Sequence, residues 1–289
     1  MQSFLKLSAG DVARELLEDF EFLGTMQHAA LISRRDVGSL LEDNVRAALV
    51  ASTLRLKSLD YARKRYIEDR PPSPHSDRHE AYVAAYKAAK RYVQRVIEKL
   101  DTRERPEPTM GVFGASVVLE RLPASFFCAH LLYRLGHKYE GHAVARVILE
   151  QIAWAYSAHL TDDMEVIQKI ETTRTISGLK NLLPDAGRLY GFLSSKTHID
   201  YSSHEEFLQV EGDNNVVIHA KGEFLEFAQV ILTLADYFGI VWEVTQIGYI
   251  DAPEAVHADK TAKPSINSNR PFAKEMADHL KLVKEYGDA

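Results

Sequence analysis

Apolar residues recur every three or four positions over most of this chain, which is the spacing of amphipathic α-helices. Breaks in the spacing coincide with proline or glycine clusters, so the pattern divides the chain into long helices with short connections. The predicted helices cover approximately residues 34–69, 78–101, 113–159 in two pieces divided at Gly136 to Gly141, 162–170, 179–196, 222–248, and a last short segment ending at Tyr286.

Two of these helices form a predicted hairpin near the start of the chain. No proline interrupts residues 34–69. The tract Arg-Pro-Pro-Ser-Pro-His at 70–75 ends that helix, because proline lacks an amide donor and pushes the preceding residue out of helical geometry. Residues 78–101 then return antiparallel to the first helix. A shorter amphipathic helix, opening at Ser8 and including Phe20, is expected before the hairpin.

Extended structure is predicted at one place. Residues 207–210 and 216–219 are short apolar runs that flank the turn-forming sequence Gly-Asp-Asn-Asn at 212–215. The sequence therefore predicts an all-α protein, with a long N-terminal helical hairpin packed against a C-terminal helical bundle and one small β-hairpin.

Prolines and charge suggest where the chain divides. Residues 101–111 combine two prolines with alternating charges. Basic side chains predominate over residues 51–110, whereas acidic ones predominate over residues 111–289. We therefore expect an N-terminal hairpin region at 1–105, a bundle core at 106–250, and a polar linker with a final helix at 251–289.

Composition narrows the class of protein. The net charge of -6, with 46% hydrophobic and 26% charged residues, excludes a disordered tail and a wholly basic nucleic-acid binder. A single cysteine, Cys128, fits a reducing compartment. No signal peptide or long uncharged apolar stretch is evident, so we expect a cytoplasmic protein without a membrane segment. Long amphipathic helices also favour a homodimer.

The helix at 142–159 carries charges on an otherwise apolar surface. Arg146 and Glu150 lie four residues apart and therefore on one face, with His142 one turn earlier. Burying such groups without partners costs several kcal/mol. One interpretation is a mutual ion pair that sets helix register. The other is a polar pocket in which Arg146 holds an anionic group and Glu150 orients it or transfers a proton.

A second polar cluster follows in the sequence. Tyr190, Ser194 and His198 fall within three helical turns, and the spacing of Ser194 and His198 permits a hydroxyl–imidazole hydrogen bond. Helix capping is the alternative explanation. His198, Asp200 and His204 match no specific metal motif, so we expect neither a metal nor a cofactor. If the protein is an enzyme, which the sequence leaves open, His198, Arg146 and Glu150 are the candidate catalytic residues.

Basic residues recur along the helix at 78–101. Lys87, Arg91, Arg95 and Lys99 form a stripe, and tyrosines are interleaved with it. Phosphate contacts from the stripe and base stacking on tyrosine suit single-stranded nucleic acid. A solvated helix face, or docking onto the acidic second part of the chain, is the alternative.

The polar positions also carry a family resemblance. Arg146-x-x-x-Glu150, followed by Tyr190-x-x-Leu193-Ser194 and His198, resembles a family of uncharacterised bacterial helical proteins, some of which are associated with phage-defence loci. The chain is more distantly similar to the HEPN superfamily, helical bundles that include ribonucleases with an arginine and a histidine close together on one helix. Arg188 and His198 are the corresponding pair here, but nine residues separate them.

These observations lead to three functional hypotheses. The first is a bacterial bundle that binds an unknown small ligand, RNA or protein partner through a pocket lined by Arg146, Glu150, Tyr190, Ser194 and His198, in a defence or stress system. The second is a HEPN-like ribonuclease. The third is non-enzymatic binding of single-stranded nucleic acid by the basic helical hairpin.

Overall fold

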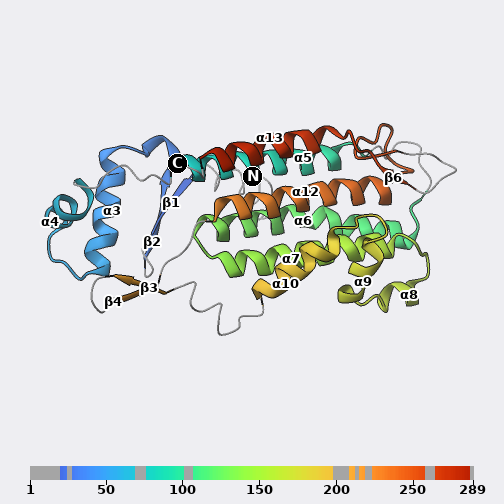
Figure 1. Ribbon diagram of the computed structural model, residues 1–289, viewed down its shortest axis with the longest axis horizontal. Coiled ribbons are helices and arrows are strands. Elements are labelled where there is room, and N and C mark those ends of the chain that lie inside the picture. The colour runs from blue at the N-terminus through green and yellow to red at the C-terminus, as the bar shows by residue number, and fades with distance from the viewer. Residues whose placement is uncertain are drawn as a thin grey trace, which may run out of the picture. The chain divides into compact units, whose positions relative to one another are not determined.

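The computed structural model describes residues 20–24, 28–68, 76–100, 107–197, 208–211, 215–218, 223–257 and 264–286. They fall into two compact units, one within Met1–Pro74 and the other within His75–Ala289. Figure 1 shows the elements of both. Helices predominate in the described residues, and the strands form small two-stranded hairpins. The all-α prediction is therefore confirmed.

The first unit combines a β-hairpin with short helices. Its elements are β1 (Phe20–Gly24), β2 (Ala29–Ser33), η1 (Arg34–Asp36), α3 (Leu40–Thr53), α4 (Leu59–Arg63) and the π-helical segment η2 (Lys64–Glu68). β1 pairs antiparallel with β2. The prediction of a helix through Phe20 is therefore wrong at this end, and the residues around its predicted start at Ser8 lie outside the described part of the chain.

The prediction of one uninterrupted helix over 34–69 is also wrong. Helix α3 ends in a Schellman motif, in which the amide of Leu56 donates to the carbonyl of Ala51 and the amide of Arg55 to that of Ser52. Arg55 takes the left-handed φ of 53° that this turn requires. Glycine usually occupies such a position, so the sequence carries no clear stop signal. Ser58 then caps α4 by accepting a hydrogen bond from the amide of Tyr61.

The second unit is a helical bundle. Its helices are α5 (Ser76–Glu98), α6 (Met110–Arg134), α7 (Lys138–Ala158), α8 (Met164–Gln168), α9 (Thr172–Leu179), α10 (Ala186–Thr197), α12 (Phe224–Thr245) and α13 (Pro271–Glu285). The predicted division between α6 and α7 is confirmed. Gly136 adopts a left-handed φ of 79° just after α6, where a residue with a side chain would be strained.

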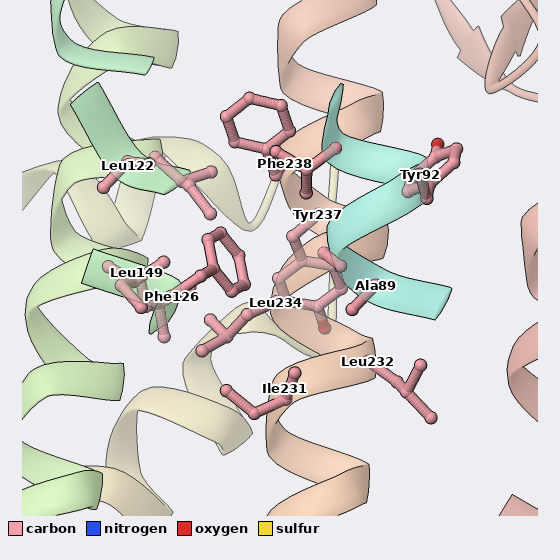
Figure 2. Close-up of a cluster of buried hydrophobic side chains, with 14 of the residues drawn as sticks. Ala89, Tyr92, Leu122, Phe126, Leu149, Ile231, Leu232, Leu234, Tyr237 and Phe238 are labelled. Carbon is pink, nitrogen blue, oxygen red and sulfur yellow. The ribbon is translucent and has the colours of Figure 1, made fainter. Parts of the chain in front are cut away.

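Helix α12 forms the centre of this bundle. From Phe227 to Thr245 nearly every side chain is buried, including Trp242 and Phe238. Helices α5, α6, α7 and α13 all contact it, and Figure 1 shows α13 and α5 on one side of α12 and α7 on the other. Figure 2 shows apolar side chains of α5 and α6 meeting those of α12. A helix that is apolar around its circumference is stable in water only when neighbours cover it, and this one is covered.

The division into units falls inside the predicted helical hairpin. The segment 34–68 belongs to the first unit, whereas α5 packs against α12, α13 and α6 in the second. The expected boundary near 105 lies between α5 and α6, two helices of one unit that contact each other. Alanines of α5 explain this partner choice, because Ala85, Ala88 and Ala89 are buried and let the helix approach its neighbours closely.

The predicted small β-hairpin is confirmed. β3 (Leu208–Glu211) pairs antiparallel with β4 (Asn215–Ile218), with Glu211 opposite Asn215. A two-residue pair, β5 (Val256–His257) and β6 (Ser265–Ile266), lies between α12 and α13 in the sequence.

Two buried acids of α12 hold the segment that follows it. Arg270 donates from Nε and Nη2 to the two carboxylate oxygens of Asp236, at 2.6 Å each. Glu243 is fully buried and accepts hydrogen bonds from the backbone amides of 254–256. Burial raises the pKa of Glu243, although these amides act to lower it. Both acids therefore stabilise the packing of the segment after α12 against this helix.

Within the described residues, α6 and α12 are long and apolar enough to cross a membrane, judged by length and composition alone. In α12, 72% of the most apolar stretch of 18 residues is buried inside the protein, whereas in α6 only 28% of the corresponding stretch is buried. Core helices of soluble proteins meet the same criterion, so this finding is weak evidence for a membrane segment. The expected cytoplasmic location stays a prediction.

The Arg270–Asp236 pair gives the first testable prediction. Changing Arg270→Met leaves the Asp236 carboxylate buried without its cation, and we expect a loss of about 3–5 kcal/mol in the free energy of unfolding, measured with urea. Arg188→Met removes an exposed pair with Asp185 and should cost less than about 1 kcal/mol. Equal effects of the two substitutions would show that the buried pair does not hold α13 in place.

Candidate functional site

One face of α7 carries four ionisable residues at helical spacing. Lys138, His142, Arg146 and Glu150 follow one another at intervals of four, so their side chains leave the helix on one side. Lys138 and His142 are buried, and Arg146 and Glu150 are partly buried. Helices α10 and α12 both pack against α7, and their polar side chains contact this face. We call this row of four residues the α7 polar face.

Arg146 is the hub of the first cluster on this face. Its Nε donates to Glu150 at 2.9 Å, its Nη1 to the hydroxyl of Thr197 at 3.2 Å, and its Nη2 to the hydroxyl of Tyr190 at 3.1 Å. The guanidinium carbon also lies 5.2 Å from the centre of the Tyr190 ring. The structure therefore brings three of the predicted site residues together, Arg146, Glu150 and Tyr190. We call them, with Thr197, the Arg146 cluster.

The cluster is reachable from solvent. The side chain of Arg146 keeps 22% of its surface exposed, and that of Glu150 keeps 16%. Burial by itself lowers the pKa of Arg146, but the hydrogen bond and charge of Glu150, together with Tyr190, raise it above its usual range. The guanidinium is therefore a permanent cation at a half-buried position.

The other two predicted site residues are placed differently. Ser194 lies on α10 one turn before the helix end, and its backbone carbonyl accepts a hydrogen bond from the hydroxyl of Thr197. That contact ties Ser194 to the cluster through the backbone. His198 lies outside the described residues, as do Asp200 and His204, so the proposed Ser194–His198 hydrogen bond stays a prediction.

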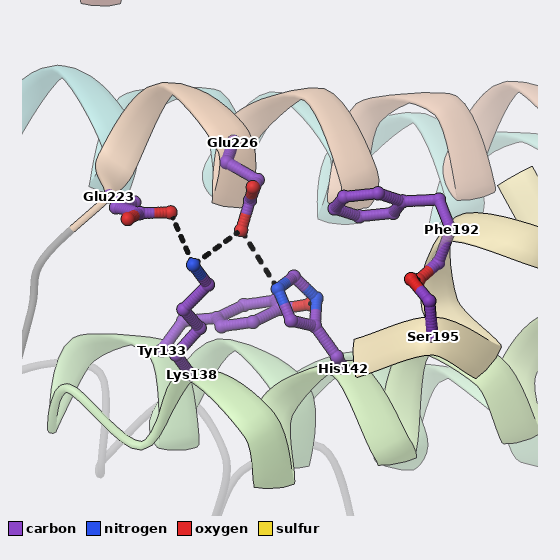
Figure 3. Close-up of polar contacts among 7 residues, drawn as sticks. All are labelled: Tyr133, Lys138, His142, Phe192, Ser195, Glu223 and Glu226. Carbon is purple, nitrogen blue, oxygen red and sulfur yellow. Dashed lines mark hydrogen bonds and ion pairs between the residues drawn. The ribbon is translucent and has the colours of Figure 1, made fainter. Parts of the chain in front are cut away.

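A second polar cluster lies at the other end of the α7 polar face, as Figure 3 shows. The ammonium of Lys138 is 2.6 Å from Oε2 of Glu223 and 3.6 Å from Oε1 of Glu226. His142 is also 2.9 Å from the same oxygen of Glu226, through its Nε2. Glu223 and Glu226 stand at the start of α12. We call Lys138, His142, Glu223 and Glu226, with Tyr133, the Glu226 cluster.

The hydrogen bonds of His142 are satisfied by one arrangement of protons. Its Nδ1 lies 2.9 Å from the hydroxyl of Tyr133, and complete burial holds the pKa of that tyrosine well above its ordinary value. Tyr133 therefore keeps its proton, and its hydroxyl is hydrogen-bonded to Nδ1. A carboxylate only accepts hydrogen bonds, so Nε2 of His142 carries a hydrogen and donates it to Glu226.

Close packing holds this arrangement in place. The ring of Tyr133 stacks on Phe227 with centroids 4.3 Å apart. It also lies so close to Gly141 that a Cβ there would be 2.4 Å from a ring carbon. Gly141 is therefore needed for the close approach that aims the Tyr133 hydroxyl at His142.

The Glu226 cluster was not predicted from the sequence. A partial signal exists, since the spacing of Arg146 and Glu150 extends backwards through His142 to Lys138. The acids that meet these groups lie more than eighty positions away in sequence, and nothing local to Lys138 indicates that the start of α12 packs beside it.

The basic stripe of α5 is largely engaged within the protein. Arg91 pairs with Glu275 at 3.5 Å. Lys99 and Arg95 both approach Glu254, at 2.6 Å and 3.9 Å. Three of the four predicted phosphate-binding residues therefore face acids that follow α12 in the sequence. These contacts agree with the alternative stated above, docking onto the acidic second part of the chain. Arg91 and Arg95 keep 64% and 46% of their side-chain surface exposed, so their phosphate contacts stay a prediction. Lys87 is the fourth and is partly buried.

The tyrosines of α5 cannot stack against bases. Tyr82, Tyr86 and Tyr92 are almost completely buried. Tyr86 stacks on His130 with centroids 3.6 Å apart, and Tyr92 stacks on Phe272 at 3.8 Å. Their interleaving with basic residues reflects the amphipathic period of the helix. The expectation that tyrosines of the hairpin offer stacking surfaces is therefore wrong for these three, whereas Tyr61 and Tyr66 of the first unit are exposed.

Comparison with known protein families, with curated proteins and with solved structures found no match. The resemblance drawn from Arg146, Glu150, Tyr190, Ser194 and His198 therefore stays a prediction. Within the described part of the chain, no group of three or more His, Cys, Asp or Glu side chains is arranged to hold a metal ion.

Gly141 gives the second testable prediction. Gly141→Ala places a methyl group against the Tyr133 ring, so the ring must move and its hydroxyl must leave His142. We expect a loss of about 1–3 kcal/mol in the free energy of unfolding, measured by urea denaturation. Gly191→Ala is the control, because a Cβ at this helical position has no atom within 4 Å, and it should be neutral or stabilising. A neutral Gly141→Ala would contradict the packing argument.

The Glu226 carboxylate gives the third prediction. Burial raises the pKa of Glu226, but the hydrogen bond from His142 and the charge of Lys138 outweigh it and bring the pKa below 4.5. A lowered pKa adds stability above the unfolded-state value that is lost as the pH falls through the folded-state value.

The wild-type protein should therefore be more stable than Glu226→Gln by about 1–3 kcal/mol near neutral pH. That difference should shrink between about pH 5 and about pH 3, as measured by urea unfolding at each pH. Glu165→Gln, at an exposed position beside Lys169, is the matched control and should change little. A difference that does not depend on pH would contradict the assignment.

Proposed function

We propose that this protein binds a ligand through the Arg146 cluster, with the guanidinium contacting an anionic group of that ligand. The observation that carries the proposal is the half-buried, permanently charged Arg146 held in one orientation by Glu150, Tyr190 and Thr197. A fixed guanidinium presents its remaining N–H groups in a fork that matches a carboxylate or a phosphate.

The donors of Arg146 are not exhausted by its neighbours. A guanidinium has five N–H groups, and three of them have acceptors among the described residues. Nη1 and Nη2 each keep one hydrogen beyond those given to Thr197 and Tyr190. A purely structural ion pair needs Glu150 alone, whereas the two hydroxyls from α10 also fix the plane of the guanidinium. This preorganisation supports a binding role.

The charge of Glu150 sets the strength of binding. Its carboxylate takes Nε and offsets one positive charge, so the site attracts an anion through directed hydrogen bonds more than through net charge. Binding of this kind favours a ligand whose anionic oxygens are placed to accept two N–H groups at once. A role in bacterial defence or stress is proposed on the family resemblance alone.

The fourth prediction tests the Arg146 cluster with three phosphate-bearing probes, inorganic phosphate, adenosine monophosphate and a short single-stranded RNA. We expect isothermal titration calorimetry to show binding of at least one probe by the full chain. Arg146→Met should weaken that binding at least about tenfold, the effect of losing one charge-assisted contact. Arg174→Met, at an exposed position of α9, is the control and should leave binding unchanged.

The same mixtures separate the remaining hypotheses. RNA that becomes fragmented on a gel, in wild-type protein and not in Arg146→Met, would favour the ribonuclease hypothesis. Loss of stability in Arg146→Met, with no probe bound by the wild type, would favour the ion pair as a purely structural device. Binding that is equal in wild type and Arg146→Met would overturn the proposal.

A further inference from the structure

The second unit contains a cavity that is separate from the Arg146 cluster. A cavity of about 590 Å³ opens between α10, α12, α13 and the start of α5, which is within the range of small-molecule sites. Most of its wall is apolar. The apolar lining residues are Leu189 and Phe192 of α10, Phe224, Leu225 and Val230 of α12, and Val283 of α13. Arg146 is not among the residues that line it.

Two carboxylates interrupt this apolar wall. Glu223 and Glu226 line the cavity, and their side chains keep 36% and 25% of their surface exposed. Both contact the same cation, the ammonium of Lys138, which lies behind them and is only 6% exposed. Lys196 adds a weaker attraction to Glu226 at longer range. Glu223 and Glu226 therefore share the ammonium group of Lys138.

Each carboxylate keeps an acceptor for a ligand. Lys138 and His142 both contact Oε1 of Glu226, and Lys138 contacts Oε2 of Glu223. The other oxygen of each acid has no hydrogen-bond partner among the residues that the structure describes. Carboxylates beside an apolar wall are poorly hydrated, so a cation that reaches these oxygens gains more than it would in water.

The Glu226 carboxylate is also held in position from behind. The fully buried His142 donates to it, and Tyr133 fixes the orientation of His142. Phe192 links this support to the cavity, because its ring contacts His142 edge to face at 5.4 Å and also lines the cavity wall. Figure 3 shows Phe192 beside the imidazole, on the same side of α7 as Glu226.

From these observations we propose that the cavity binds an organic ammonium ion with an apolar body, its ammonium group on Glu226 and Glu223 and its body against Leu189, Phe192 and Val230. Two cations also line the cavity: Arg78, which donates to the backbone carbonyl of Tyr286, and Lys284, which is exposed on α13.

Octylamine, octanol and octanoate are suitable probes, because they share one apolar body and differ in the charge of the head group. We expect isothermal titration calorimetry on the full chain to show octylamine binding at least about tenfold more tightly than octanol, and octanoate more weakly still. Glu226→Gln should reduce this preference for the amine, whereas the exposed Glu165→Gln should leave it unchanged.

A second variant keeps the test independent of the Glu226 cluster. Leu189→Trp enlarges an apolar side chain of the cavity wall and leaves both carboxylates in the sequence, and it should weaken octylamine binding at least about tenfold. Arg146→Met should not affect octylamine, so failure of the Arg146 proposal and failure of this one are distinguishable. The proposal is overturned if octanol or octanoate binds as tightly as octylamine, if none of the three binds, or if Leu189→Trp binds octylamine normally.

Discussion

The burial of α12 on all sides is the constraint on which the rest of the second unit depends. A helix this apolar must be enclosed by neighbours, yet it carries three acidic residues, and each of them needs a partner in the place where it points. Asp236 accepts hydrogen bonds from Arg270, and Glu243 accepts them from the backbone amides of 254–256. Glu226, near the exposed start of the helix, forms contacts with His142 and Lys138. The contacts of Asp236 and Glu243 hold the segment after α12 against the bundle. The contacts of Glu226 engage its Oε1 and leave Oε2 for a ligand.

The same enclosure explains why the polar residues of α7 lie where they do. Helix α7 packs against α12 at one part of its polar face and against α10 along another. The first contact creates the Glu226 cluster, and the second creates the Arg146 cluster. The two clusters therefore share one helix but differ in sign. One presents a guanidinium to solvent, and the other presents carboxylates to an apolar cavity. The α7 polar face thus supports two binding proposals, one for an anionic ligand at Arg146 and one for a cationic ligand at Glu226.

Sequence reasoning succeeded where the signal was local. The break at Gly136, the pairing of β3 with β4, and the shared face of Arg146 and Glu150 all follow from spacing or turn chemistry within a few residues. It failed at Arg55, because a residue other than glycine adopts the left-handed turn that ends α3. It also failed for the tyrosines of α5. Their alternation with basic residues is compatible with a nucleic-acid surface or a buried helix, and only their contacts with His130 and Phe272 distinguish the two.

The sequence by itself determined that the chain is mostly helical, where long helices such as α5, α7 and α12 lie, and that charged groups share a face of α7, because backbone periodicity depends on neighbours a few residues apart. Only the tertiary structure decided which acids and hydroxyls those charges meet. Tyr190 and Thr197 reach Arg146 from α10, and Glu226 reaches His142 from α12, through helix packing that no local pattern encodes. The cavity also exists only in the folded protein, since its wall is assembled from helices that are distant in the chain.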